Sequence, residues 1–312
     1  MCALFGIIDY ANYFNRKQKN IILSVLSTEC EIRGTDATGI AYNVGEALKV
    51  FKRPISAHQM RYLMPENVKV IMGHTRMTTQ GDEAKNYNNH PFLGSVGNTD
   101  FAFAHNGIIY NDDTIIKSHK LPKTKIETDS YIGVQLIEKE KSLTFESLAK
   151  MAETVRGNFT FTILDSADNL YFIKGDNPIC IAHFASRGFY LYASTDEILD
   201  ETLKRLGVTN KEYERVVVRC GEILRIDVNG KRTTSEFDTI GVHSSYYGYF
   251  RPHSYRFNEG FRDVVDGEHL SMVKSMASAF GYTSGDVDDM LADGYTLAEV
   301  EEMFYEDETV YQ

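Results

Sequence analysis

The chain begins with the stretch MCALFGI, residues 1–7, in which a cysteine follows the first methionine and opens a run of apolar residues. An apolar run of this length predicts a short β-strand with most of its side chains buried. Cys2 then has two interpretations. It is either a thiol at the start of a buried strand, or the first residue of the mature protein after removal of Met1, carrying a thiol and a free amine.

The composition is that of an ordinary globular protein, with 43% hydrophobic and 25% charged residues among 312. No run of about 18 apolar residues is present, so we expect no membrane span, and no secretory signal opens the chain. The four cysteines form no CxxC pair and have no histidine at metal-ligand spacing, which predicts neither disulfides nor a metal site. We therefore expect a cytoplasmic protein without a metal or an organic cofactor.

Acidic residues are concentrated toward the C-terminal end of the sequence. Residues 241–312 contain 14 acidic and 4 basic residues, a balance of −10, whereas the whole chain has a formal net charge of −11. Neither part has a basic stripe, so we expect no binding to nucleic acid. Because the composition changes near residue 240, the sequence predicts a domain over residues 1–240. An aromatic-rich linker and a small acidic helical tail are expected over residues 241–312.

Short apolar runs alternate with amphipathic segments over the first three quarters of the chain. These patterns predict strands at residues 3–9, 38–44, 47–52, 68–76, 100–107, 158–165, 170–175, 179–184, 189–194, 214–219 and 222–230. They predict helices at residues 17–34, 128–140, 144–155 and 195–207, and three short helices between residues 268 and 305. Many strands with interspersed helices favour two sheets between helical layers.

Four polar segments stand out because each follows an apolar strand, where loops often carry functional groups. They are RGTDATG (33–39), GHTRMTTQG (73–81), AHNG (104–107) and ETDS (127–130). Taken one at a time, each has an ordinary structural interpretation: a turn, a strand end, a hairpin turn and a helix N-cap.

Together with Cys2, the ordered motifs Met-Cys, RGxDxxG, GHTR, HNG and ETD resemble those of the class II glutamine amidotransferases, which are N-terminal-nucleophile hydrolases. The resemblance covers residues 2–232, including the later YASTDEIL, and is strongest to the glutaminase domains of glucosamine-6-phosphate synthase and phosphoribosylpyrophosphate amidotransferase. It implies an α+β fold, a four-layer α-β-β-α sandwich, here with a small helical C-terminal extension. It also implies hydrolysis of L-glutamine to glutamate and ammonia.

The residue types suit that chemistry. After removal of Met1, the α-amine of Cys2 has a pKa near 8 and can accept the thiol proton at neutral pH. The thiolate then attacks the carboxamide, releases ammonia and leaves a thioester for water to cleave. By the resemblance, the side-chain amide of Asn106 and the backbone N–H of Gly107 form the oxyanion hole.

Binding a free amino acid requires a partner for each of its charged α-groups. Arg76 can hold the α-carboxylate in a bidentate fork, and Asp129 can pair with the α-ammonium group. The resemblance assigns both residues these roles, gives Thr79 a part in holding the carboxylate, and leaves Arg33 and Asp36 to shape the site.

Two positions depart from the pattern of the glucosamine-6-phosphate synthases, which have Trp and His where this chain has Met77 and Gln80. These departures weaken any inference about a flap that senses the acceptor, but not the inference of glutamine hydrolysis. His74 and His105 lie next to functional positions, and we expect them to be buried structural residues.

The ammonia must be used by a protein that provides the acceptor site. Class II glutaminase domains are normally fused to a synthase, whereas about 75 residues follow the domain here and no GxxxxGK[ST] loop is present. We therefore expect either a separate ammonia-accepting synthase as partner or a free-standing glutaminase. The tail is interpreted as a helical cap on the domain or as a partner-binding bundle, and the oligomeric state is not predicted.

Two alternatives remain open from the sequence. One is an N-terminal-cysteine amidase for another amide, which would have no use for the pair Arg76 and Asp129. The other is a non-catalytic module that binds partners through the acidic tail, against which the complete set of candidate site residues argues.

Overall fold

The structure is a computed structural model in which the described residues are 2–45, 47–208, 213–243, 270, 271, 273–275, 277, 282–292, 297 and 300. The chain divides into two compact units, Met1–Val242 and His243–Gln312. Most of the helices expected between residues 268 and 305 lie outside the described residues, and so does the aromatic-rich segment. Within the second unit, α8 spans Ser284–Ala292.

The first unit contains two antiparallel sheets. Sheet A has the strand order β11-β9-β10-β1-β4-β2-β3, and sheet B has the order β13-β12-β8-β7-β6-β5. The strands of sheet A are β1 (Ala3–Ile8), β2 (Ala37–Val44), β3 (Ala47–Arg53), β4 (Val70–Arg76), β9 (Cys180–Phe184), β10 (Phe189–Ala193) and β11 (Glu214–Val216). Those of sheet B are β5 (Phe92–Val96), β6 (Thr99–Ile109), β7 (Gly157–Asp165), β8 (Leu170–Lys174), β12 (Glu222–Ile226) and β13 (Arg232–Glu236).

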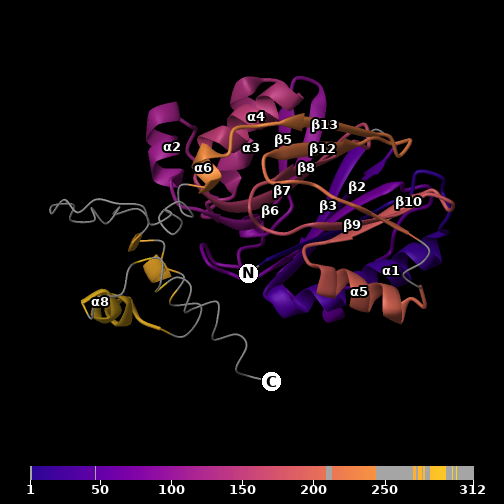
Figure 1. The fold of residues 1–312 in the computed structure, drawn as a ribbon, viewed down its shortest axis with the longest axis horizontal. Coiled ribbons are helices and arrows are strands. Elements are labelled where there is room, and N and C mark those ends of the chain that lie inside the picture. Colours follow the sequence, from indigo (N-terminus) through magenta and orange to yellow (C-terminus); the bar gives the residue numbers. More distant parts are fainter. Residues whose placement is uncertain are drawn as a thin grey trace, which may run out of the picture. The chain divides into compact units, whose positions relative to one another are not determined.

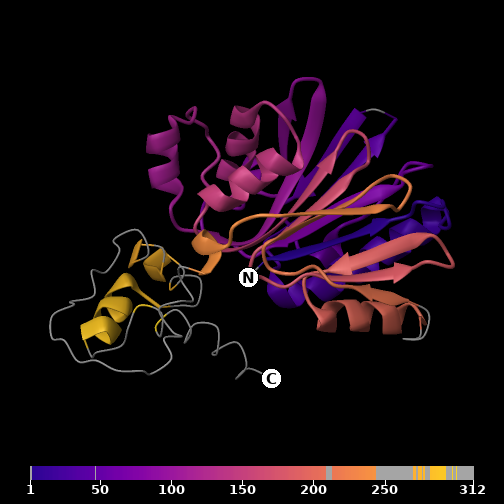
Figure 2. The same ribbon diagram turned by 45° about the horizontal axis from the view of Figure 1, so that its top comes forward.

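Helices cover the outer faces of both sheets. They are α1 (Arg16–Glu29), α2 (Asp112–His119), α3 (Tyr131–Glu140), α4 (Phe145–Thr154), α5 (Asp196–Arg205) and the short α6 (Ile240–His243). Short 3₁₀ turns lie at η1 (Cys30–Arg33), η2 (Ala57–Gln59) and η3 (Asn86–Asn88). In Figure 1, α3 and α4 lie above the strands and α1 and α5 below them, and Figure 2 shows the same separation. The predicted four-layer α-β-β-α sandwich is therefore confirmed.

Alternation of side chains along the strands builds the layers. In β1, Phe5 packs in the apolar cluster that includes Leu23 and Leu26 of α1, whereas its neighbour Leu4 packs in the cluster between the sheets. A third cluster joins sheet B to α3 and α4. Successive residues of a strand point to opposite faces, so a strand that is buried on both faces must be apolar throughout. This explains why residues 3–8 form an unbroken apolar run.

The structure differs from the sequence-based expectations in the position of the AHNG segment and in the division of strands between the two sheets. The AHNG segment, expected to end a strand and enter a hairpin turn, lies within β6, where Asn106 pairs with Thr160 and Gly107 pairs with Phe159 on β7. The four strands expected between residues 158 and 194 are divided between the sheets, since β7 and β8 belong to sheet B and β9 and β10 to sheet A. The sequence pattern also missed α2, β5 and β13.

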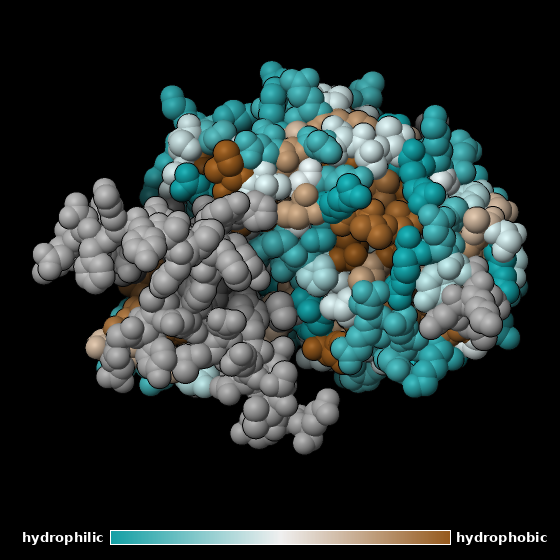
Figure 3. Space-filling model, viewed as in Figure 1, coloured by the Kyte–Doolittle hydropathy of each residue, from teal (hydrophilic) through white to brown (hydrophobic). Residues whose placement is uncertain are grey.

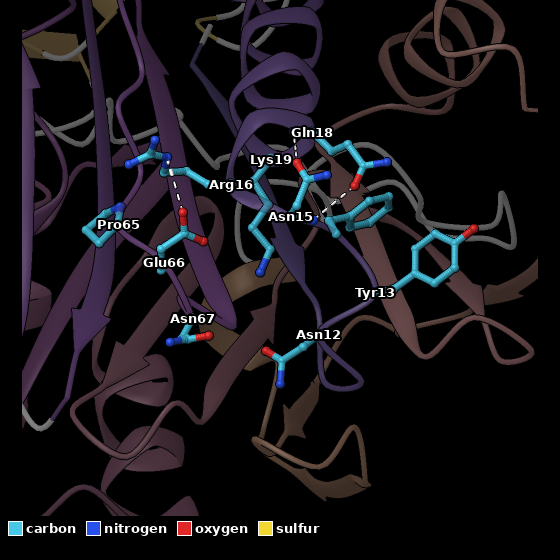
Figure 4. Close-up of a pocket in the computed structure, with 10 residues that line it drawn as sticks. Asn12, Tyr13, Asn15, Arg16, Gln18, Lys19, Pro65, Glu66 and Asn67 are labelled. Atoms are coloured by element: carbon cyan, nitrogen blue, oxygen red, sulfur yellow. Dashed lines mark hydrogen bonds and ion pairs between the residues drawn. The ribbon is translucent and has the colours of Figure 1, made fainter.

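A buried ion pair fixes the end of β1 that lies away from Cys2. The Lys19 ammonium group lies 2.9 Å from Asp9 Oδ2 and donates to the carbonyl of Val68 at 2.6 Å. Asn15 and Gln18 close the start of α1 by exchanging two hydrogen bonds, a capping box. Figure 4 shows this capping pair, with Lys19 extending from the helix toward the strand end. These contacts therefore hold the C-terminal end of β1, opposite Cys2, in place beside the start of α1.

On the face shown in Figure 3, the first unit is largely hydrophilic, and the largest group of apolar residues lies right of centre, over the strands between the two helical layers. Among the residues that the structure describes, no helix is long and apolar enough to cross a membrane.

Candidate active site

The Cys2 thiol lies where β1 begins and β4 ends. Ala3 of β1 pairs with Thr75 of β4. Cys2 and Arg76, the next residues along each strand, therefore lie at the same end of these two central strands of sheet A. The thiol donates to the carbonyl oxygen of Met77 at 3.6 Å. Burial raises the pKa of the Cys2 thiol, and the charge of Arg76 opposes that rise. The thiol therefore needs a base to become a nucleophile near neutral pH.

Arg33, the last residue of η1, connects the two sheets at this point. Its Nε donates to the carbonyl of Cys2 at 3.0 Å, and its Nη2 donates to Asn106 Oδ1 at 3.4 Å. Cys2 directly precedes β1 of sheet A, and Asn106 belongs to β6 of sheet B. Arg33 therefore sets the nucleophile relative to the candidate oxyanion donor.

The orientation of the Asn106 amide follows from its two neighbours. A guanidinium group can only donate hydrogen bonds, so the amide atom that faces Arg33 must be the oxygen. The amide nitrogen then faces Ser194, to whose hydroxyl it donates at 3.4 Å. The same hydroxyl accepts from the backbone N–H of Leu4 at 2.8 Å. Asn106 is fully buried, and one of its two N–H donors remains for a ligand oxygen.

Gly107 occupies a position that excludes a side chain. Its φ is +141°, and a Cβ there would lie 1.9 Å from the carbonyl oxygen of Asn158. The carbonyl of the preceding residue, Asn106, accepts from Asn177 Nδ2 at 2.9 Å. The backbone at this point of β6 is therefore held in a conformation that only glycine adopts readily.

Arg76 is buried and held by the loop that follows it. Its Nη1 donates to Asn89 Oδ1 at 2.6 Å, and its Nη2 donates to the carbonyls of Gln80 and of Gly81, the latter at 3.2 Å. Burial lowers the pKa of Arg76, and the Cys2 and Asp129 side chains oppose this effect. All of these acceptors are neutral, so the positive charge of Arg76 is available to an anion.

The Asp129 carboxylate is also buried and interacts with the charge of Arg76. Its Oδ2 accepts from the backbone N–H of Ile109 at 2.6 Å, and its Oδ1 accepts from the Ser130 hydroxyl at 3.2 Å. Burial raises the pKa of the Asp129 carboxyl group, while these hydrogen bonds and Arg76 lower it. The Asp129 backbone N–H donates to Gln80 Oε1 at 2.9 Å. Gln80 therefore contacts both candidate substrate-binding residues.

Asp36 and Thr79 complete the predicted set. Asp36 Oδ2 accepts from the backbone N–H of Thr78 at 2.6 Å, and its own N–H donates to the carbonyl of Arg76 at 3.0 Å. These bonds shape the start of the loop after β4. Thr79 lies in that loop and is half-buried. Thr79 therefore belongs to the same loop as Gln80 and Gly81, whose carbonyls hold Arg76.

The neighbouring histidines are buried and neutral. His74 Nε2 donates to the carbonyl of His105 at 2.9 Å, and the ring of His90 stacks on His74 with centroids 4.2 Å apart. His105 Nδ1 lies 2.9 Å from the Ser130 hydroxyl. Burial lowers the pKa of both His74 and His105 to about 3. They support the strands behind the site and do not supply a base near neutral pH.

Sequence reasoning missed Ser194 and Asn89, and it noted Gln80 only as a departure from the family pattern. Ser194 belongs to the YAST segment, whose resemblance was noted without a role for this residue. Within the described part of the chain, no group of three or more His, Cys, Asp or Glu side chains is arranged to hold a metal ion.

Comparisons with known proteins identify relatives of this chain. Residues 74–201 match a family model described as "Glutamine amidotransferase domain". The glutamine–fructose-6-phosphate aminotransferase (isomerizing) of Geobacillus kaustophilus is 27% identical over 268 residues, which cover 80% of this chain and 42% of that enzyme. The 7-cyano-7-deazaguanine synthase of Sulfolobus acidocaldarius is 26% identical over 212 residues, covering 65% and 45% of the two chains.

Solved structures show the same fold. The glutamine phosphoribosylpyrophosphate amidotransferase of B. subtilis, complexed with ADP and GMP, superposes with a TM-score of 0.61 and 21% identity, over 76% of this chain and 49% of that one. The chain thus spans less than half the length of each of these relatives.

Proposed function

We propose that this chain is a class II glutamine amidotransferase that hydrolyses L-glutamine to glutamate and ammonia through a thioester on Cys2, a proposal supported by the match of residues 74–201 to a glutamine amidotransferase domain and by the similarity to the Geobacillus enzyme. One observation carries this proposal above the others. The strand register places Cys2 next to Arg76, and Gln80 accepts hydrogen bonds from both the Arg76 guanidinium group and the Asp129 backbone, so a thiol, a cation and an anion converge at one site.

The free amino acid fits this combination of charges. The α-carboxylate of glutamine would pair with Arg76, whose three hydrogen bonds to the protein leave two of its five N–H donors for a ligand. The α-ammonium would pair with Asp129, which accepts hydrogen bonds but donates none from its carboxylate. A simple acyl amide has neither charged group, so the pair favours glutamine over the alternative amidase substrates.

The chemistry needs a base, an acyl acceptor and an oxyanion hole. With Met1 removed, the Cys2 α-amine takes the thiol proton, and the sulfur attacks the side-chain carboxamide of glutamine. Asn106 Nδ2 and the Gly107 N–H receive the negative oxygen of the tetrahedral intermediate. The ammonium group of Cys2 returns the proton to the leaving nitrogen, ammonia departs, and water then cleaves the thioester to release glutamate and restore the thiol.

We propose that the ammonia is used by a synthase site, on a partner protein or on another domain. The name of the Geobacillus relative describes transfer from glutamine to fructose 6-phosphate, and this chain matches 42% of that enzyme's length. The residues matched here would then be the ammonia source.

Replacement of the nucleophile tests the assignment. Cys2→Ala should abolish release of glutamate from glutamine, measured by coupled glutamate dehydrogenase assay. Cys220→Ala, at an exposed cysteine, is the matched control and should retain activity. A Cys2→Ala protein with parent activity would contradict the proposal, and faster turnover of simple acyl amides than of glutamine would favour the amidase.

The mature N-terminus provides a second test. Intact mass should show that active protein lacks Met1, because only then is the α-amine of Cys2 free. A variant with a residue before Cys2 that cannot be removed should lose glutaminase activity while keeping its fold by circular dichroism. Full activity with a blocked amine would show that another group acts as the base.

A further inference from the structure

A cavity lies beside β3, the outer strand of sheet A. It adjoins the candidate active site, because Asn89 accepts hydrogen bonds from both Lys52, which lines the cavity, and Arg76. Its volume is about 440 Å³, and its lining includes the rings of Phe51, Tyr87, Phe92 and Tyr131 together with Lys52. None of the candidate catalytic or glutamine-binding residues lines it. Cavities of roughly 300–1,000 Å³ with mostly apolar walls and a few polar groups are typical of small-molecule sites.

Lys52 is the charged group of this cavity. Its Nζ donates to the carbonyls of Asn89 and of Pro91, the latter at 3.0 Å, and lies 5.0 Å from the centroid of the Phe92 ring. Burial and the nearby charge of Arg76 lower the pKa of Lys52 to about 8. Within the described residues no carboxylate lies within ion-pair distance of Lys52, and both hydrogen-bond acceptors are neutral. The ammonium group therefore lacks a counter-ion, a costly state for a largely buried charge.

Further cations lie over the aromatic walls. Arg53 lies 5.5 Å from the centroid of Phe51, and Lys125 lies 4.8 Å from that of Tyr87. The carboxylate of Glu127, which follows the lining residue Ile126, is paired with Lys85 at 2.7 Å. The surroundings are thus cationic in a chain whose formal net charge is −11. This charge pattern selects for a negatively charged ligand.

We propose that this cavity binds a small anion with an aromatic or flat apolar body, whose carboxylate or phosphate pairs with the Lys52 ammonium group. The aromatic rings contact the body of the ligand. The third N–H of Lys52, beyond the two that bind carbonyls, donates to its anionic group. Benzoate and phenyl phosphate represent the two forms of the anion, and benzamide is a neutral molecule of nearly the same shape as benzoate.

Isothermal titration calorimetry on the full chain tests the proposal. Benzoate, phenyl phosphate or both should bind with a dissociation constant of about 1 mM or lower, and the stronger of the two identifies the preferred anionic group. Benzamide should bind at least tenfold more weakly than benzoate. Absence of binding by both anions, or equal binding of benzoate and benzamide, would overturn the proposal.

A pair of variants on the same strand locates the site. Lys52→Met keeps the length of the side chain and removes its charge, so affinity for the preferred anion should fall at least tenfold. Lys49→Met, at an exposed position of β3, should leave that affinity unchanged. Equal affinity in the parent and in Lys52→Met would contradict the assignment.

A measurement on the parent protein does not depend on how the variant folds. In ¹³C-labelled lysine spectra, the pKa of Lys52 should rise from about 8 when the anion is bound, because a paired ammonium group loses its proton less readily. A pKa of Lys52 that does not change at saturating ligand would place the anion elsewhere and overturn the proposal.

Discussion

The side-chain amide of Asn106 is fixed by two neighbours with different hydrogen-bonding roles. Arg33 can only donate, so it takes the amide oxygen, and the Ser194 hydroxyl accepts from the amide nitrogen. A free asparagine can turn its amide through 180°, but here that would bring the amide N–H₂ against the N–H donors of Arg33. The candidate oxyanion donor is therefore oriented before any substrate binds, which is the condition for effective stabilisation of a transition state.

Asn106→Ala should lower kcat about 10²–10³-fold and change KM little, because the donor acts on charge that develops only in the transition state. Steady-state glutaminase kinetics measure this, with Asn229→Ala at an exposed turn as the control. A rise in KM at constant kcat would instead assign Asn106 to ground-state binding.

The candidate motif residues, including Arg33 and Asp36, could be named from the sequence, whereas Ser194, Asn89 and the role of Gln80 in holding Arg76 and Asp129 could not. Cys2, Arg76 and Asp129 carry thiol and charged groups whose chemistry is visible in the residue type. Gln80 acts through its main-chain carbonyl on Arg76 and through its side-chain oxygen on the Asp129 backbone. The residue type of Gln80 gives no indication that its side chain contacts the backbone of a residue 49 positions away.

At the scale of elements, three histidines form one buried cluster: His74 of β4, His105 of β6, and His90 of the segment between η3 and β5. His90 has no hydrogen-bond partner on either ring nitrogen among the described residues, and it stacks on His74 and contacts Phe92. Burial lowers the pKa of His90 well below its usual value. The ring is therefore held as an apolar aromatic group in the folded protein.

His90→Phe should flatten the dependence of stability on pH. Below pH about 6.5 the unfolded chain binds a proton at His90 that the folded chain does not, so stability falls as pH falls through this range. Removing the group should reduce that slope by about 1.4 kcal/mol per pH unit, as measured by urea unfolding between pH 6 and pH 4. Slopes above pH 7 should coincide, and identical slopes below pH 6 would show that His90 titrates alike in both states.

Most of the strands that the sequence predicted have continuous apolar runs, because they are buried on both faces. β13 alternates between half-buried and exposed residues, so its polar sequence RTTSE gives no such signal. The AHNG segment extends its predicted strand farther than expected for a different reason. Its Asn-Gly pair favours a turn locally, but the ladder with β7 extends the strand through both residues. Tertiary pairing here overrides a local preference.

At the scale of the whole molecule, the four-layer arrangement follows from three apolar clusters that separate four layers. All three belong to the first unit, as do all candidate site residues. The number and type of most elements could be read from periodicity, but not which strands share a sheet. That grouping depends on contacts such as β1 with β10, whose paired residues Phe5 and Ala193 are far apart in the sequence.

A chain that ends at His243 should therefore fold and hydrolyse glutamine with kcat and KM within about threefold of the full chain, since it retains every residue of the site. Calorimetric melting and glutaminase assays on both proteins measure this. Loss of the cooperative transition in the shorter chain would show that residues 244–312 are part of the domain's core. Loss of activity alone would assign them to catalysis.

Because Arg33 contacts both Cys2 and Asn106, the proposed catalysis should depend on how the two sheets are aligned. Small residues such as Ala41, Ala102 and Ala104 lie among larger side chains in the apolar layer where the two sheets pack against each other. A displacement of about 1 Å along that layer would leave every ladder of hydrogen bonds within each sheet intact, yet it would misalign nucleophile and oxyanion donor, a change that can cost about 10²-fold in rate. A larger side chain at one of these alanines should therefore shift the sheets and lower the proposed activity, although it contacts neither Cys2 nor Asn106 and the protein stays folded.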